Sequence, residues 1–161
     1  MDTTEHATSG FRCRSILVGT DGSPEAALAV DWAAGLAHAL DATVTVVHAL
    51  ALMDHLPGQP ETISVDIRDS LLTLLETEWT SRLRELGVAH ECVMEDGPPL
   101  LAIPRVAARV GADLIVVASH GRGRSTALLM GSTSHGLAQT SSLPLVILPV
   151  RGDNPIQPGP R

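Results

Sequence analysis

Short apolar runs alternate along this chain with amphipathic, helical patterns, and this alternation constrains the fold more than any other feature. Unbroken apolar runs are typical of strands that are buried on both faces of a parallel sheet. Strands are predicted over 15–20, 43–49, 89–94, 113–118 and 143–150. Helices are predicted between them, over 23–40, 63–86, 97–110 and from residue 131 or 132 to 140. The sequence therefore predicts an α/β fold, a three-layer sandwich on a five-stranded, mostly parallel sheet with right-handed crossovers.

Two prolines fall inside these predicted elements. Pro104 lies within the helix predicted over 97–110 and should kink this helix or delay its start. Pro149 lies within the last predicted strand, where it would remove one donor from the hydrogen-bond ladder.

The length and charge of the chain limit its class. A chain of 161 residues fits one domain, expected over 15–151 between a flexible tail over 1–14 and a tail rich in proline and glycine over 152–161. The net charge of −7 argues against general nucleic-acid binding, which needs a basic face. The N-terminus does not read as a signal peptide, and no apolar run approaches the roughly 20 residues that span a bilayer. These features predict no membrane association. Cys13 and Cys92 are few and far apart, so no disulfide scaffold is expected, and the protein is expected to be cytoplasmic.

The residues at the ends of the first and fourth predicted strands indicate a ligand site. The first strand ends at Gly19-Thr20-Asp21, before a strong helix start, and the fourth ends at 118–121. In open parallel sheets, ligands bind beyond the carboxyl ends of the strands, where the strand order reverses. These two strands are the candidates to flank that point, so both signals indicate the same cleft.

The stretch over 119–134 has the features of a phosphate-binding loop. Glycines allow main-chain N–H groups to approach an anion, and the start of the next helix attracts negative charge. The candidate donors are the N–H groups of Gly121 and Ser132 and the Ser132 hydroxyl, with Arg122 or Arg124 nearby. The stretch contains neither a Walker A run nor a complete dinucleotide fingerprint. Taken alone, it is equally well interpreted as a loose surface loop.

In their order and spacing, these pieces resemble the universal stress protein family over about 15–151. The matching stretches are 16–23, 46–49, 112–117 and 143–148. The family's nucleotide motif is a glycine, two residues, a glycine, nine residues, and a glycine followed by serine or threonine. Gly121, nine further residues and Gly131-Ser132 fit this spacing, and Ala118 stands in place of the first glycine.

The resemblance implies a Rossmann-like sheet that binds ATP or a related adenine nucleotide without a well-defined catalytic reaction. It also implies a homodimer that forms through the last strands. By position, Asp21 would hold the ribose or a Mg²⁺ ion bridged to the phosphates, since Mg²⁺ needs only one or two protein carboxylates. Gly19 and Ala49 would lie against the adenine, with Val117 beside it.

The same resemblance assigns the phosphates to Gly121, Gly131 and Ser132. The full set of nucleotide-binding candidates is Gly19, Asp21, Ala49, Val117, Ala118, Gly121, Arg122, Arg124, Gly131, Ser132 and Thr133.

Alternatives remain open at this level. Ala118 and Arg124 depart from the family's pattern, which fits a nucleotide-free interaction module on the same fold. Cyclic AMP could replace ATP because the adenine and ribose contacts would be shared. No water-activating base is evident at a fixed position, so the chain is expected to be at most a slow ATPase. Asp21 could also simply form a turn before glycine, and His48 and Trp79 are expected to be structural residues.

Overall fold

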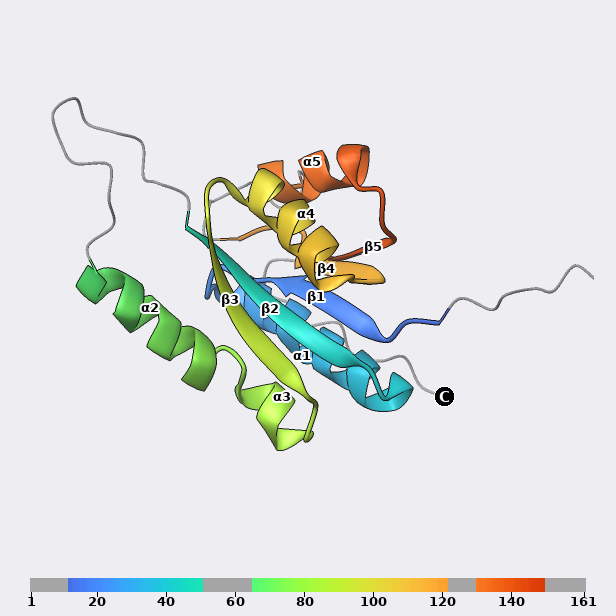
Figure 1. Ribbon diagram of the computed structural model, residues 1–161. Coiled ribbons are helices and arrows are strands. Elements are labelled where there is room, and N and C mark those ends of the chain that lie inside the picture. The colour runs from blue at the N-terminus through green and yellow to red at the C-terminus, as the bar shows by residue number, and fades with distance from the viewer. Residues whose placement is uncertain (1–11, 51–64, 122–129, 150–161) are drawn as a thin grey trace, which may run out of the picture.

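The computed structural model describes residues 12–50, 65–121 and 130–149 (Figure 1). The strands in these ranges are β1 (Ser15–Gly19), β2 (Thr43–Leu50), β3 (His90–Asp96), β4 (Leu114–Ala118) and β5 (Leu145–Leu148). The helices are α1 (Pro24–Leu40), α2 (Val65–Thr77), α3 (Ser81–Glu85), α4 (Pro99–Val110) and α5 (Ser132–Thr140). Among the residues that the structure describes, no helix has both the length and the apolar character needed to cross a lipid bilayer. The predicted tails lie outside these ranges, apart from residues 12–14.

The strands form one sheet in the order β3-β2-β1-β4-β5, and every neighbouring pair is parallel. The predicted α/β fold is confirmed. From β1 the chain moves first to one side of the sheet, through β2 and β3, and then to the other, through β4 and β5. The strand order therefore reverses between β1 and β4, the two strands that the sequence singled out.

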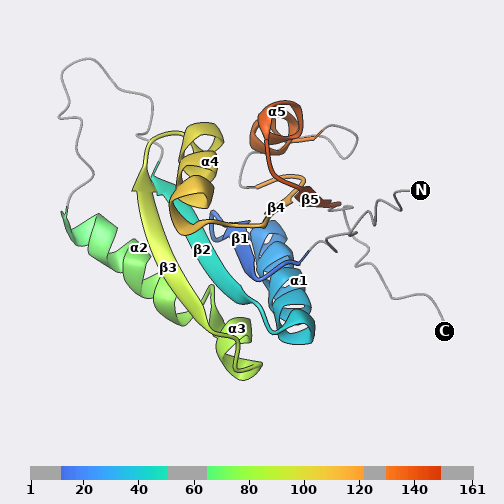
Figure 2. The ribbon, with the colours of Figure 1, turned by 45° about the vertical axis from the view of Figure 1, so that its right-hand side comes forward.

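Helices cover both faces of the sheet, which gives three layers (Figures 1 and 2). On one face, Ile16, Val44 and Val116 pack with the alanines of α1, with Leu75 of α2 and with Leu83 of α3. On the other face, alternate residues of the same strands pack against α4 and α5; this second cluster contains Leu17, Val47, Ile103, Val106, Ala107, Ala112, Ile115, Val117 and Leu137. Small side chains on α1 let the helix lie close to the Val-rich strands.

Local sequence explains where α1 begins and ends. Ser23 is its N-cap, and the Ser23 hydroxyl accepts a hydrogen bond from Ala26 N at 3.1 Å. Pro24 occupies the first helical position, where its missing N–H group is not needed. Asp41 ends the helix in the left-handed conformation with φ of 53°. The beginning of α1 is thus fixed directly after the turn that follows β1.

The prediction of one helix over 63–86 is wrong, because the structure contains two helices there. The chain leaves α2 after Thr77 and enters α3 at Ser81. The fully buried Thr80 fixes this break, since its hydroxyl donates to Leu75 O at 2.9 Å. Leu75 and Leu83 on either side are both buried, so the apolar spacing continues across the break.

One proline prediction is wrong, and the other is wrong in part. The helix α4 begins at Pro99 and continues through Pro104, so Pro104 does not delay its start, and the kink at Pro104 stays a prediction. The last strand is shorter than predicted and ends at Leu148. Pro149 therefore lies beyond β5 and removes no donor from the ladder with β4.

Candidate functional site

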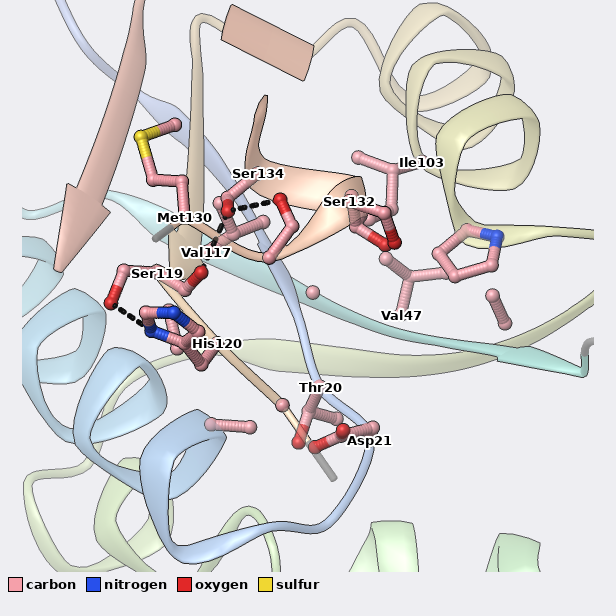
Figure 3. A pocket seen from close by; sticks show the side chains of 18 residues that line it. Thr20, Asp21, Val47, Ile103, Val117, Ser119, His120, Met130, Ser132 and Ser134 are labelled. Carbon is pink, nitrogen blue, oxygen red and sulfur yellow. Dashed lines mark hydrogen bonds between the residues drawn. The ribbon is translucent and has the colours of Figure 1, made fainter. Parts of the chain in front are cut away.

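A cavity of about 440 Å³ opens at the carboxyl ends of β1 and β4 (Figure 3). Its wall combines the turn after β1, the end of β2, the start of α4, the end of β4 with the residues after it, and the start of α5. The volume falls within the range of about 300–1,000 Å³ typical of small-molecule sites. The cavity lies where the strand order reverses, which is the usual place for a ligand in this architecture.

One part of the cavity is apolar. Val47 and Ala49 come from β2, Val117 from β4, and Ile103 from α4. Val47, Val117 and Ile103 also belong to the core cluster beneath α4 and α5. This part of the wall is therefore continuous with the packed interior, which suits a flat, apolar ligand group.

Asp21 occupies the turn between β1 and α1, on the opposite side of the cavity from Ser132 and Ser134 (Figure 3). Its Oδ1 atom accepts a hydrogen bond from Ser23 N at 3.0 Å, which fixes the carboxylate by an Asx turn. The next residue, Gly22, has φ of 73°, a left-handed conformation that glycine adopts without strain. Asp21 is thus both the turn-forming residue of the alternative interpretation and part of the cavity wall.

At Gly121, the segment after β4 lies against the turn after β1. A Cβ atom at this position would lie 3.1 Å from Asp21 Cγ and would overlap Asp21 Oδ2. The Asp21 carboxylate therefore lies directly against the main chain of the segment after β4. A larger residue at position 121 would force the Asp21 carboxylate to move, independently of any ligand.

The start of α5 forms the other polar wall. Gly131 is the N-cap, and its N–H group donates to Ser119 O at 2.8 Å. The buried Ser134 hydroxyl donates to the same carbonyl at 2.7 Å. Because Gly131 N and Ser134 Oγ already bind protein, Ser132 and Thr133 are the better candidates to bind an anion at this helix end.

Ser119 and His120 add a hydrogen-bonded pair to the wall, with Ser119 Oγ 3.0 Å from His120 Nδ1. Among the described lining residues, Asp21 and His120 carry the only ionisable side chains. The described residues contain no group of three or more histidine, cysteine, aspartate or glutamate side chains able to hold a metal ion.

Those predicted site residues that the structure describes all lie around this one cavity. The predicted residues that line the cavity are Gly19, Asp21, Ala49, Val117, Ala118, Gly121, Gly131, Ser132 and Thr133. Arg122 and Arg124 lie outside the described residues. The nucleotide-binding roles of all these residues stay predictions.

The cavity is also lined by residues outside the list of nucleotide-binding candidates: Thr20, Ala26, Val47, Pro99, Ile103, Ser119, His120, Met130 and Ser134. The sequence already placed Thr20, Ser119 and His120 at the strand ends that flank the cleft, without giving them a nucleotide contact. Ile103 carries no local signal, because it reaches the cavity only through the packing of α4 on the sheet.

The fold and this cavity together define a doubly wound, parallel α/β protein with a ligand-sized cavity at the reversal of its strand order. Residues 13–149 match the universal stress protein family, and the chain belongs to that family.

Several relatives support this assignment. The universal stress protein YxiE of Bacillus subtilis is 32% identical over 144 residues, which cover 83% of this chain and 97% of YxiE. The universal stress protein Rv2005c of Mycobacterium tuberculosis is 32% identical over 136 residues, which cover 82% of this chain but only 44% of Rv2005c. The chain thus spans almost all of one relative and less than half of another.

Among solved structures, a universal stress protein in complex with cAMP is 26% identical to this chain and has a TM-score of 0.68. The match covers 85% of this chain and 97% of that protein.

Proposed function

We propose that this chain binds an adenine nucleotide in the cavity between the Asp21 turn and the start of α5. One observation carries the proposal: a carboxylate and a helix N-terminus face the same 440 Å³ cavity from two sides, beside an apolar wall. A purine fits the apolar part, a carboxylate accepts hydrogen bonds from ribose hydroxyls, and a helix N-terminus favours phosphate. The 26% identical universal stress protein that was solved with cAMP also supports this ligand class.

ATP is the ligand that we propose first. Ala49 and Val117 would contact the adenine, Asp21 the ribose, and Ser132 and Thr133 the phosphates. Asp21 is the one carboxylate among the described lining residues, which suits a Mg²⁺ ion held chiefly by phosphates and water. Since His120 is the only other ionisable side chain there, we propose slow hydrolysis or none, and a regulatory role in the stress response.

Calorimetric titration of the purified chain with ATP, AMP and cAMP, each with and without Mg²⁺, tests this function. We expect saturable binding of ATP that Mg²⁺ strengthens, and little release of phosphate over hours. Absence of binding heat for all three ligands, with a folded sample, would reject the proposal in favour of a nucleotide-free interaction module.

Replacing Asp21 tests its role within the site. Asp21→Asn keeps an oxygen that can accept from Ser23 N, so the turn should persist, but it removes the charge. We expect affinity to fall about tenfold or more, the usual effect of losing a charged hydrogen-bond acceptor. Asp41→Asn, at the opposite end of α1, is the matched control and should leave affinity unchanged. Equal affinity of the Asp21 and Asp41 variants would exclude Asp21 as a ligand contact.

Cyclic AMP is the second candidate, because the solved relative was crystallised with it. A cyclic phosphodiester carries no terminal phosphate, so its binding should not depend on Mg²⁺. Tighter binding of cAMP than of ATP, insensitive to Mg²⁺, would favour this candidate.

We also propose a homodimer that forms through β5 and a cytoplasmic location. The edge strand β5 has four apolar residues that are only partly buried, which supports pairing with a second copy. The free thiols of Cys13 and Cys92 are compatible with a reducing compartment.

A further inference from the structure

The turn that carries Asp21 is held from the face of the sheet opposite α4. Val47 and Ala49 of β2 line the cavity, so His48 between them points to the other face of the strand. There the His48 ring packs edge-on against the ring of Trp79, with 5.2 Å between the ring centroids. Neither His48 nor Trp79 lines the described cavity.

His48 fixes the residue that precedes Asp21. Its Nδ1 atom lies 2.9 Å from Thr20 O, and since a carbonyl can only accept, Nδ1 carries the proton and donates. The N–H group of Thr20 donates to Val47 O at 2.9 Å. Both main-chain polar groups of Thr20 are therefore bound to β2.

Trp79 fixes the residue that follows Asp21. A Cβ atom at Gly22 would lie 2.8 Å from Cη2 of Trp79, so the indole ring covers this glycine closely. Trp79 itself lies between α2 and α3, where its main-chain N–H group donates to Leu74 O at 3.0 Å and the next residue, Thr80, is fully buried. The indole is thus attached to a well-anchored part of the molecule on the same face as α1 (Figure 1).

We propose that His48 and Trp79 are positioning residues, which hold the Asp21 turn in the geometry that binds ligand. This inference rests on the proposed nucleotide site. Asp21 lies between two residues that are each held from outside the cavity, so the position of its carboxylate depends on the pair. Affinity should therefore respond to substitutions on the far side of the sheet, with no change to any residue of the cavity wall.

Four variants test this inference. His48→Leu removes the donor to Thr20 O, whereas His48→Asn keeps an N–H donor near the position of Nδ1. Trp79→Leu removes the ring over Gly22, and Trp32→Leu, which removes a 41% exposed indole from α1, is the matched control. Each variant is compared with the unsubstituted chain by ATP calorimetry, well below its unfolding temperature, and by amide hydrogen exchange at Ser23, whose N–H group bonds Asp21.

We expect His48→Leu to weaken ATP binding about five- to tenfold, the effect of one lost hydrogen bond, and to speed exchange at Ser23. His48→Asn should restore both values, and Trp79→Leu should resemble His48→Leu. Trp32→Leu should bind as the unsubstituted chain does. The chain has 2 tryptophans, so Trp79 is the sole tryptophan of the Trp32→Leu variant. The fluorescence of Trp79 in this variant should change as ATP saturates the site.

Three results would overturn the inference: wild-type exchange at Ser23 in both His48→Leu and Trp79→Leu, faster exchange without loss of affinity, or no rescue by His48→Asn. A loss of thermal stability with affinity intact would show that the pair only packs the core. If the unsubstituted chain binds no nucleotide, the proposed function fails and the link to affinity fails with it. The exchange rates would then still show whether the pair holds the turn.

Discussion

The lack of a side chain at Gly121 leaves room for a neighbouring side chain, and not only for a ligand. The sequence motif suggests that glycine is needed there for close approach to phosphate. The structure gives a second reason, because the Asp21 carboxylate occupies the space that a Cβ atom would take. The spacing of the motif and the geometry of the turn after β1 are therefore linked through a single contact.

The contact between Gly121 and Asp21 leads to a prediction for Gly121→Ala. The added methyl group should displace the Asp21 carboxylate and lower nucleotide affinity about tenfold, with little change in fold. Calorimetric titration measures the affinity, and scanning calorimetry measures the stability.

Gly35→Ala is the control, because nothing lies within 4 Å of the Cβ position of Gly35 in α1. This control should raise stability by about 0.5–1 kcal/mol and leave affinity unchanged. An unchanged affinity in Gly121→Ala would contradict the proposed contact between the Asp21 carboxylate and the nucleotide.

Residues that reach the cavity through packing could not be predicted from the sequence. Asp21 and Gly131 lie at a strand end and at a helix start, and the resemblance to the family assigned them to the nucleotide site. Ile103 lies in the middle of α4, where only the docking of the helix on the sheet turns it toward the cavity. Ser134 reads as an ordinary helical serine, and its bond to Ser119 O depends on how the chain returns from β4.

At the scale of elements, α5 is tied to the end of β4 by two hydrogen bonds to one carbonyl. Gly131 N and Ser134 Oγ both donate to Ser119 O. A short helix has little stability of its own, so these bonds and the burial of Leu137 determine where its N-terminus lies. The helix end that we propose to bind phosphate is thus positioned by protein contacts.

The two serines of this helix end should respond differently to replacement by alanine. Ser134→Ala removes a buried hydrogen bond and should lower the free energy of unfolding by about 1 kcal/mol. Ser132→Ala changes an exposed residue at the mouth of the cavity, and should lower nucleotide affinity with stability nearly unchanged. Denaturant unfolding and calorimetry measure the two effects. The opposite pattern, with stability lost in Ser132→Ala alone, would contradict this division of roles.

The break between α2 and α3 shows why the order of elements was predictable but one helix was not. Leu75 and Leu83 both fit a helical spacing, and both are buried. The spacing does not reveal that the chain turns at Thr80, because the turn depends on a buried hydroxyl bonded to Leu75 O. Strands and caps are local features and were predicted within a few residues, whereas the break depends on tertiary contacts.

At the scale of the whole molecule, the open edge at β5 is the surface that pairs two copies in the proposed dimer. Pro144 O and Leu148 O accept hydrogen bonds from Ile115 N and Ser119 N of β4. Alternate residues of a strand direct their main-chain groups to opposite sides, so the N–H group of Ile147 points to the open edge. This group therefore points to the side on which a strand from a second copy would lie in the proposed dimer.

Ile147→Pro tests the proposed dimer by removing that outward N–H group. We expect the unsubstituted chain to be a dimer and Ile147→Pro a folded monomer, as measured by light scattering with circular dichroism as the check on folding. Pro149→Ala is the matched control, since Pro149 lies beyond β5, and it should remain a dimer. A folded Ile147→Pro dimer would show that the copies associate through another surface.

The two edge strands of the sheet differ in chemical character. The edge strand β5 consists of aliphatic residues, whereas the edge strand β3 includes His90, Glu91, Glu95 and Asp96. Arg105 and Arg109 bind Glu95 at 2.9 and 2.8 Å, and Arg68 binds Asp96 at 2.8 Å. Charged edges resist strand addition, so the outer β3 edges of the proposed dimer would disfavour pairing with further copies. Assembly of this kind would stop at two copies instead of growing into a fibre.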